Sequence, residues 1–296
     1  MRVLVTGASG FVGGAVVRCL AAAGHEVWSL GRRPDAASAL PVQRAFRGDV
    51  RDEDAWRPAL AGVDAVCHLA ALTRGRESLN TPEAHESVNV GGVRALLAAV
   101  PADRPPRIVL ASTAAVYGAP ERQPIDERTP PAPGNPYGAS KLAAERLLTA
   151  RPDTDAVILR CFNAAGTGDT DETRIIPRAL AVAAGRHPHL ELNGDGSVVR
   201  DFVHVEDMAD AYLLALTAPP GHHVFNVGAT PASMSEIITA VERLTGRRIP
   251  LHHRPAQPEA PRLVADTTLL RTTLAWHPHR STLDRMITDA LHSTAD

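Results

Sequence analysis

A tyrosine and a lysine four residues apart are the residues of this sequence best suited to acid–base chemistry. Tyr137-Gly-Ala-Ser-Lys141 is expected to form the first turn of a helix, where residues i and i+4 share a face. A free phenol has a pKa of about 10, so its use as a base near neutral pH requires a fall of about three, or about 4 kcal/mol. A neighbouring lysine cation acts in that direction, and a hydroxyl from Ser112-Thr113 could complete the site. The alternative is that Tyr137 packs its ring and Lys141 is solvated.

Three glycines follow the first expected strand. Residues 2–6 form a short apolar run, and Gly7, Gly10 and Gly13 then open a helical pattern that extends to about residue 23. Strand, glycine-rich turn and helix form the start of a nucleotide-binding βαβ unit, where the glycines let a pyrophosphate approach the backbone and the helix N-terminus attracts phosphate. The spacing is GxxGxxG rather than GxGxxG, and glycines also occur in ordinary turns.

The end of the second expected strand, residues 25–30, carries Arg32 and Arg33. An acidic side chain normally holds the adenosine ribose at this place, whereas a guanidinium suits a 2′-phosphate. The sequence therefore favours NADP over NAD as cofactor. The alternative is that both arginines belong to a solvated turn.

Further strands are expected at residues 42–46, 65–69, 107–111 and 156–160, with helices at 82–100 and after 136. This alternation predicts an α/β fold with a Rossmann-type doubly wound parallel sheet. Beyond residue 165 the alternation loosens, which indicates a smaller C-terminal α/β lobe. We expect residues 1–165 to form an NAD(P)-binding domain that contains the catalytic Thr113, Tyr137 and Lys141. Residues 166–296 should form mainly a substrate-binding lobe, with some segments returning to the first domain.

Composition excludes several classes of function. A formal charge of −2 with interspersed signs gives no basic stripe for nucleic acid. No apolar run approaches the roughly 20 residues that span a bilayer, so we expect a cytoplasmic protein without membrane contact. Three dispersed cysteines fit reduced thiols. The thirteen histidines show no zinc-type spacing, and the adjacent pairs His222-His223 and His252-His253 are expected in loops, so no metal site is predicted.

Seven segments in order resemble the extended short-chain dehydrogenase/reductase superfamily, and within it the nucleotide-sugar epimerase/dehydratase family typified by UDP-galactose 4-epimerase. They are residues 6–13 (TGASGFVG), 48–52 (GDVRD), 68–71 (HLAA), 112–118 (STAAVYG), 137–141 (YGASK), 162–163 (FN) and 200–204 (RDFVH). Each motif is common alone. The resemblance covers nearly the whole chain.

This resemblance implies roles for individual residues. Tyr137 would be the acid/base, Lys141 would orient the nicotinamide ribose and lower the tyrosine pKa, and Thr113 would bond the reacting sugar oxygen. The expected cofactor site contains Tyr137, Lys141 and Arg32, the last predicted from its charge. The resemblance adds Gly7, Gly10, Phe11, Val12, Asp49, Val50, Leu69, Ala70, Ala71 and Asn89. The diphosphate of a nucleotide sugar would meet Asn163, Arg200 and Arg254, and Arg174 is a further candidate. The alternative for Arg200 is an ion pair with Asp201.

Departures from the family pattern narrow the function. Ala114-Ala115 replaces the Asp-Glu pair that the sugar 4,6-dehydratases carry after the active-site threonine, which argues against dehydration. The leading hypothesis is a nucleotide-sugar 4-epimerase that works through a 4-keto intermediate. The alternatives are an NADPH-dependent nucleotide-sugar 4-ketoreductase and, remotely, a non-catalytic dinucleotide sensor. The family commonly forms homodimers through the helices around residues 82–100 and 137–150.

Overall fold

Seven parallel strands form the central sheet of the computed structural model, which describes residues 1–257 and 259–293. The sheet has the order β10-β6-β5-β4-β1-β2-β3. Its members are β1 (Arg2–Thr6), β2 (Glu26–Gly31), β3 (Arg44–Arg47), β4 (Ala65–His68), β5 (Arg107–Thr113), β6 (Ala156–Cys161) and β10 (His222–Val227). The order β3-β2-β1-β4-β5-β6 is that of a doubly wound dinucleotide-binding sheet. The predicted Rossmann-type α/β fold is confirmed.

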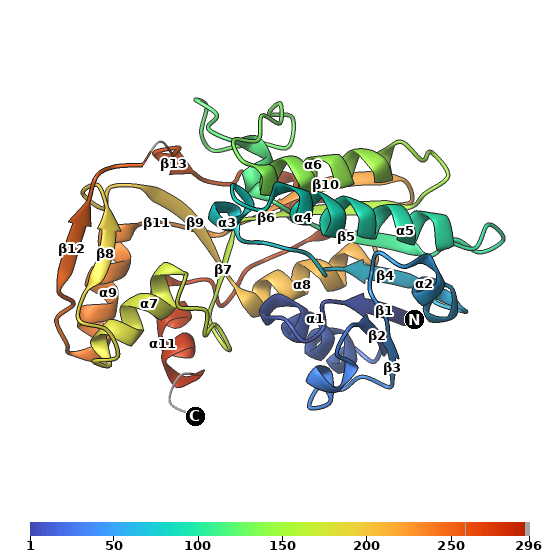
Figure 1. Cartoon of the computed structure of the whole chain (residues 1–296), viewed down its shortest axis with the longest axis horizontal. Helices are drawn as coiled ribbons and strands as arrows, with labels where there is room; N and C mark the ends of the chain where they lie inside the picture. Colours follow the sequence, from blue (N-terminus) through green and yellow to red (C-terminus); the bar gives the residue numbers. More distant parts are fainter. Residues whose placement is uncertain (258, 294–296) are drawn as a thin grey trace.

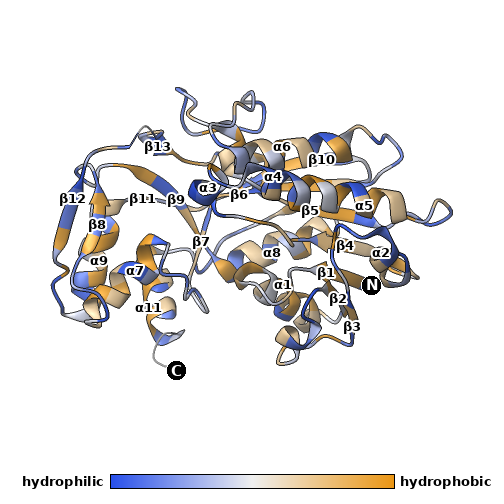
Figure 2. Ribbon diagram, in the orientation of Figure 1, coloured by the Kyte–Doolittle hydropathy of each residue, from blue (hydrophilic) through white to orange (hydrophobic). Residues whose placement is uncertain are grey.

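Helices cover both faces of this sheet (Figure 1). One face packs against α1 (Phe11–Ala22), α8 (Val205–Ala215) and α10 (Thr268–Leu274), and the other against α2 (Glu53–Leu60), α5 (Gly91–Ala99) and α6 (Pro136–Thr149). Alternate residues of β1 serve the two layers: Val3 and Val5 pack with α1 and α8, whereas Leu4 packs with α2 and α5. Burial on both faces explains why the central strands β1 and β4 are mainly apolar, whereas the edge strand β3 is largely exposed and carries Arg44 and Arg47 (Figure 2).

A second lobe lies beside the carboxyl ends of the central strands (Figure 1). Its four-stranded sheet contains β7 (Asn163–Ala165), β9 (Val199–His204), β11 (Thr230–Ser233) and β13 (Arg262–Leu263). A separate parallel pair is formed by β8 (Leu190–Asn193) and β12 (Leu251–Arg254). Three helices, α7 (Ile175–Ala183), α9 (Met234–Thr245) and α11 (Leu283–Ser293), share the hydrophobic core of this lobe. Between these segments the chain returns to the main sheet through α8 and β10.

Two local predictions differ from the structure. The helix expected at 82–100 is divided into α4 (Pro82–His85), a π-helical turn η2 (Glu86–Val90) and α5, and Asn89 in the π-helical turn holds a neighbouring loop. The pairs His222-His223 and His252-His253 were expected in loops but lie in β10 and β12, since pairing with β6 and β8 extends those segments. The remaining short helices are η1 (Pro34–Ala37), α3 (Gly75–Ser78) and η3 (Ala114–Tyr117). Among the described residues, no helix combines the length and the apolar character needed to cross a bilayer.

A buried ion pair fastens α6 to the sheet. The Arg160 guanidinium donates to both carboxylate oxygens of Glu145, at 3.1 and 2.7 Å, and the Ser112 hydroxyl donates to the same carboxylate. Arg160 also donates to the Tyr117 hydroxyl at 3.0 Å, which in turn donates to Oδ1 of Asn226 at 2.7 Å. A buried charge pair is stable only when its remaining polar atoms are bonded. This network meets that condition and joins α6 to β5, β6 and β10.

Gly13 and Gly14 at the start of α1 provide a matched test of the packing of the first turn. A Cβ on Gly13 would lie 2.0 Å from the carbonyl oxygen of Gly7, whereas a Cβ on Gly14 would meet nothing closer than 3.5 Å. We expect Gly13→Ala to lower the free energy of unfolding by on the order of 2 kcal/mol, because backbone must move. Gly14→Ala should leave it unchanged or raise it by up to about 1 kcal/mol. Urea unfolding measures both, and equal stability of the two variants would contradict the packing.

Candidate active site

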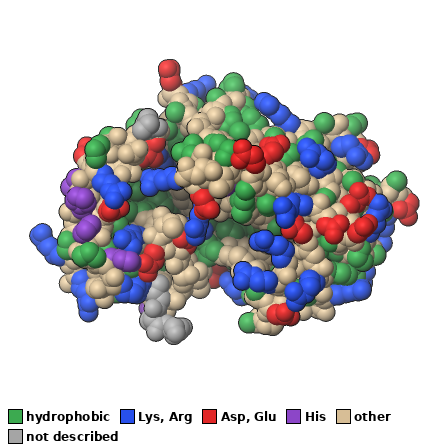
Figure 3. Space-filling model, in the orientation of Figure 1, with side chains coloured by type: hydrophobic (Ala, Val, Ile, Leu, Met, Phe, Trp, Pro, Cys, Tyr) green, Lys and Arg blue, Asp and Glu red, His purple; other side chains and the backbone are tan. Residues whose placement is uncertain are grey.

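A cleft of about 1340 Å³ runs along the carboxyl ends of the central strands and continues between the sheet and the second lobe. The hollow is visible between the two parts of the molecule in Figure 3. Single small-molecule sites usually occupy about 300–1,000 Å³, so this cleft has room for two ligands side by side. Every site residue predicted from the sequence, with the exception of Asn89, lines it.

Asn89 is buried behind the cleft wall, where it holds the loop after β4. Its Oδ1 accepts from the backbone N–H of Leu72 at 2.8 Å, and its Nδ2 donates to the carbonyl of Leu72 and to Ser140 Oγ. Thr6 Oγ1 holds the same loop by accepting from Ala70 N at 3.1 Å. With its amide used in this way, Asn89 supports the cleft wall from behind, and its expected approach to the cofactor stays a prediction.

Tyr137 lies in the first turn of α6, as predicted. Asn135 caps the helix by accepting from Gly138 N at 2.8 Å, and Ser78 Oγ accepts from the backbone N–H of Tyr137. Tyr137 and Thr113, which ends β5, line the same cleft. Burial raises the pKa of Tyr137 to about 12, while the Thr113 hydroxyl and the charge of Arg174 act in the opposite direction. The phenol is therefore a neutral proton donor.

Lys141 is buried one turn further along the same face of α6. Its Nζ donates to the carbonyl oxygen of Ala111 at 2.8 Å, and burial lowers the pKa of Lys141 to about 8. The groups that lower the pKa of Tyr137 in this structure are Thr113 and Arg174. The effect of Lys141 on the tyrosine therefore stays a prediction. Lys141 is also the single lysine among the 31 basic Lys and Arg residues of the chain.

The cofactor end of the cleft fits a dinucleotide pyrophosphate. Gly7 has a φ of +72°, and a Cβ there would lie 2.8 Å from Ala70 N, so the turn after β1 leaves no space for a side chain. The N-terminus of α1 at Gly10 has no side-chain cap and no acidic residue in its first turn. Its free N–H groups can bind an anion. Asp49 also lines the cleft, and the Arg51 guanidinium lowers the pKa of its carboxyl to about 2 and keeps it ionised.

The predicted diphosphate arginines are each paired with a carboxylate in the cleft. Arg200 Nη2 donates to Glu259 at 2.5 Å, and Arg254 forms an ion pair with Glu191. The alternative pairing of Arg200 with Asp201 is wrong, because the Asp201 carboxylate accepts backbone N–H groups instead. The two glutamates occupy the guanidinium donors that a diphosphate would use.

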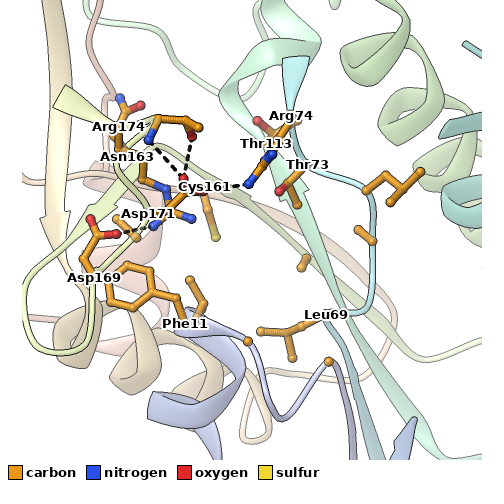
Figure 4. Close-up of a pocket in the computed structure, with 18 of the residues that line it drawn as sticks. Phe11, Leu69, Thr73, Arg74, Thr113, Cys161, Asn163, Asp169, Asp171 and Arg174 are labelled. Atoms are coloured by element: carbon orange, nitrogen blue, oxygen red, sulfur yellow. Dashed lines mark hydrogen bonds and ion pairs between the residues drawn. The ribbon is translucent and has the colours of Figure 1, made fainter. Parts of the chain in front are cut away.

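Arg174 and Asn163 lie on the wall opposite Thr113, as Figure 4 shows. Arg174 donates to Asp169 at 2.8 Å, and its guanidinium carbon lies 5.1 Å from the centre of the Phe11 ring. Burial raises the pKa of the Asp169 carboxyl to about 6. Asn163 Nδ2 donates to the carbonyl of Asp201 at 2.8 Å. This wall therefore presents a cation whose position is fixed by an acid beneath it.

Sequence reasoning missed several residues of the site. Arg74, in the loop after β4, reaches Asp171 across the cleft at 3.7 Å and lies beside Thr113 in Figure 4. Neither Arg74 nor Glu259 belongs to a motif, so no local signal marks them. Glu145 did carry a signal, because it continues the face of Tyr137 and Lys141 at four-residue spacing.

Comparison with known proteins identifies the family. The sequence profile of the NAD dependent epimerase/dehydratase family matches residues 3–228. The chain belongs to this family.

Relatives of known function and solved structures match nearly the whole of this chain. A UDP-glucose 4-epimerase of Streptomyces lividans is 39% identical, with 98% of this chain and 94% of the relative covered. The UDP-glucose 4-epimerase of Brucella ovis in complex with NAD superposes with a TM-score of 0.92 at 33% identity, covering 99% of this chain and 98% of that one. The Bifidobacterium longum enzyme in complex with NAD+ and UDP gives 0.90 at 29% identity, covering 100% and 98%. The chain is an NAD(P)-dependent enzyme of the extended short-chain dehydrogenase/reductase type, and the comparisons favour epimerisation over the ketoreductase alternative.

The low pKa of Lys141 predicts that replacing this lysine changes the stability of the fold by an amount that depends on pH. Below pH 8 its amine is charged in both the folded and the unfolded chain, so burial of the charge opposes folding. Between pH 8 and 10.5 only the unfolded chain keeps the proton, so this cost decreases as the pH rises. We expect Lys141→Met to raise the urea midpoint at pH 7, with a smaller gain at pH 9.5. Arg146→Met, on the exposed face of α6, is the control. A gain that is the same at both pH values would contradict the assignment.

Proposed function

We propose that this family member interconverts the C4 epimers of a UDP-sugar, with a nicotinamide dinucleotide and the sugar nucleotide bound together in the cleft. One observation carries the proposal: Tyr137, Thr113 and Lys141 line one cleft together with the glycine turn after β1 and with Arg200 and Arg254 of the second lobe. The UDP-glucose 4-epimerase relatives support the sugar nucleotide as substrate. In this proposal residues 1–165 form the dinucleotide-binding domain and residues 166–296 mainly the substrate lobe, with α8 and β10 returning to the first.

In this mechanism Tyr137 moves the proton of the sugar's C4 hydroxyl, and Thr113 aligns that oxygen by a second hydrogen bond. When bound, the dinucleotide supplies reversible hydride acceptance at C4, which produces a transient 4-keto sugar. Use of Tyr137 as a base near pH 7 requires its pKa to fall from about 12 by about five, or about 7 kcal/mol. Lys141 is the residue that would help to lower the pKa of Tyr137, because it lies one turn away on the same helix and its own pKa of about 8 lies near the working pH.

Gly7, Gly10, Phe11 and Val12 would hold the pyrophosphate, Asp49 and Val50 the adenine, and Leu69 to Ala71 the rest of the cofactor. On the substrate side, the diphosphate would replace Glu259 on Arg200 and Glu191 on Arg254. Asn163 and Arg174 complete this subsite. Remote binding of the diphosphate by guanidinium groups positions the sugar for reaction.

We expect Tyr137→Phe to reduce kcat by about 10²- to 10⁴-fold, because the proton acceptor is lost. Affinity for UDP and for the dinucleotide should change little. Interconversion of UDP-glucose and UDP-galactose, followed by NMR, measures turnover, and calorimetric titration measures binding. Tyr212→Phe removes another hydroxyl from the cleft and is the matched control.

Two results would oppose the proposal. Turnover by Tyr137→Phe close to that of Tyr212→Phe would exclude Tyr137 as the acid/base. Net oxidation of NADPH on a 4-keto sugar nucleotide, without any interconversion of the C4 epimers, would make the chain a ketoreductase. Binding of both ligands without turnover of either would instead indicate a dinucleotide sensor.

We also propose that the dinucleotide site prefers NADP. Arg32 and Arg33 follow β2 and are exposed at the cleft, while the nearby Asp35 and Asp49 are paired with Arg47 and Arg51. Both guanidinium groups are thus available to a 2′-phosphate. We expect Arg32→Ser to weaken NADP binding by about tenfold, or about 1.4 kcal/mol, with NAD binding little changed. Tighter binding of NAD than NADP by the unmodified chain would refute this preference.

A cytoplasmic location and a homodimer complete the proposal. Cys19, Cys67 and Cys161 are free thiols, which is usual in a reducing compartment. The helices α5 and α6, which the family commonly uses for dimerisation, pack side by side on one outer face (Figure 1).

A further inference from the structure

Three potential metal ligands gather where β8 and β12 pair. The register places His252 beside Glu191, and His189 precedes Glu191 by two residues, so all three side chains lie on one face of the two-stranded sheet. An imidazole nitrogen from each histidine and a carboxylate oxygen of Glu191 all lie within 4.8 Å of one another. The two rings meet edge to face, with centroids 5.2 Å apart. Histidine side chains are visible together at this edge of the molecule, on the left in Figure 3.

Two imidazoles and one carboxylate are a zinc-type donor set. Bonds of about 2.0–2.2 Å place the donors of a tetrahedral site about 3.4 Å apart, so the present separations are too long by at most about 1.4 Å. Glu191 and His252 are exposed, so their side chains can rotate once Glu191 releases Arg254, while the paired strands fix the Cα positions of both residues. We propose that His189, Glu191 and His252 bind a divalent transition-metal ion, for which zinc is the matching ion, with water as the remaining ligand.

Metal binding at this site would act on the substrate cleft through Arg254. Glu191 holds the Arg254 guanidinium, and both residues line the cleft. An exposed ion pair of this kind is worth only about 0–1 kcal/mol, so a divalent ion that binds Glu191 displaces the arginine. Arg254 is then free to reach the substrate diphosphate, a step that rests on the proposed function. By linkage, metal and UDP raise each other's affinity by the same factor.

The first experiment titrates tag-free protein with zinc chloride by calorimetry. We expect one site with a Kd on the order of micromolar, weakened about tenfold or more in His189→Gln and in His252→Gln. His253→Gln alters the next residue of β12, which faces the other side of the strand, and should bind zinc as the unmodified chain does. Equal zinc affinity in His252→Gln and His253→Gln would overturn the site, with circular dichroism showing that both variants are folded.

The second experiment titrates UDP into the protein with and without saturating zinc. We expect zinc to tighten UDP binding by about threefold or more, and Arg254→Gln to abolish this effect while it still binds zinc. Unchanged UDP affinity in zinc-loaded protein would overturn the coupling. Failure of UDP to bind under either condition would instead refute the proposed function, while the zinc titration would still decide the metal site.

Discussion

The ion pair between Glu145 and Arg160 is the interaction on which the active site depends. Both groups are buried, and their bonds to Ser112 and Tyr117 connect α6 to β5, β6 and β10. Loss of one partner would leave a buried charge uncompensated, which is far more costly than loss of a surface pair. The first turn of the same helix carries the phenol, so the position of Tyr137 relative to Thr113 follows from an interaction two turns away.

The central sheet and most of the site could be predicted from the sequence because their signals are local. Short apolar runs such as residues 2–6 predict strands, and the glycines that follow predict the turn. Helix periodicity places Tyr137 and Lys141 on one face. The contacts that were missed are non-local. The pairing of β8 with β12 joins residues about 60 positions apart, so neither the partner of Arg254 nor the cluster around His252 could be found from spacing. The amide of Asn89 is a third case, because its role depends on where a distant loop passes.

The choice of basic residue is itself informative. Thirty of the 31 basic Lys and Arg residues are arginines, which stay protonated at any physiological pH. The single lysine lies where a buried charge has to be adjustable, four residues after the tyrosine. A guanidinium at position 141 would hold its proton permanently and could not share in a transfer. Arginines are found instead where a fixed, forked cation is useful, at Arg32, Arg174, Arg200 and Arg254 along the cleft.

The last strand of the central sheet, β10, is added to β6 only after the first part of the second lobe, from β7 to β9, and helix α8 have been made. On the ribosome, a nascent chain would already contain six strands of this sheet while the outer edge of β6 remained uncovered. That edge is the apolar segment Ala156–Cys161, and an open apolar edge is prone to pair with other chains. We therefore expect this edge of β6 to be most prone to incorrect pairing during the interval of some sixty residues before β10 emerges.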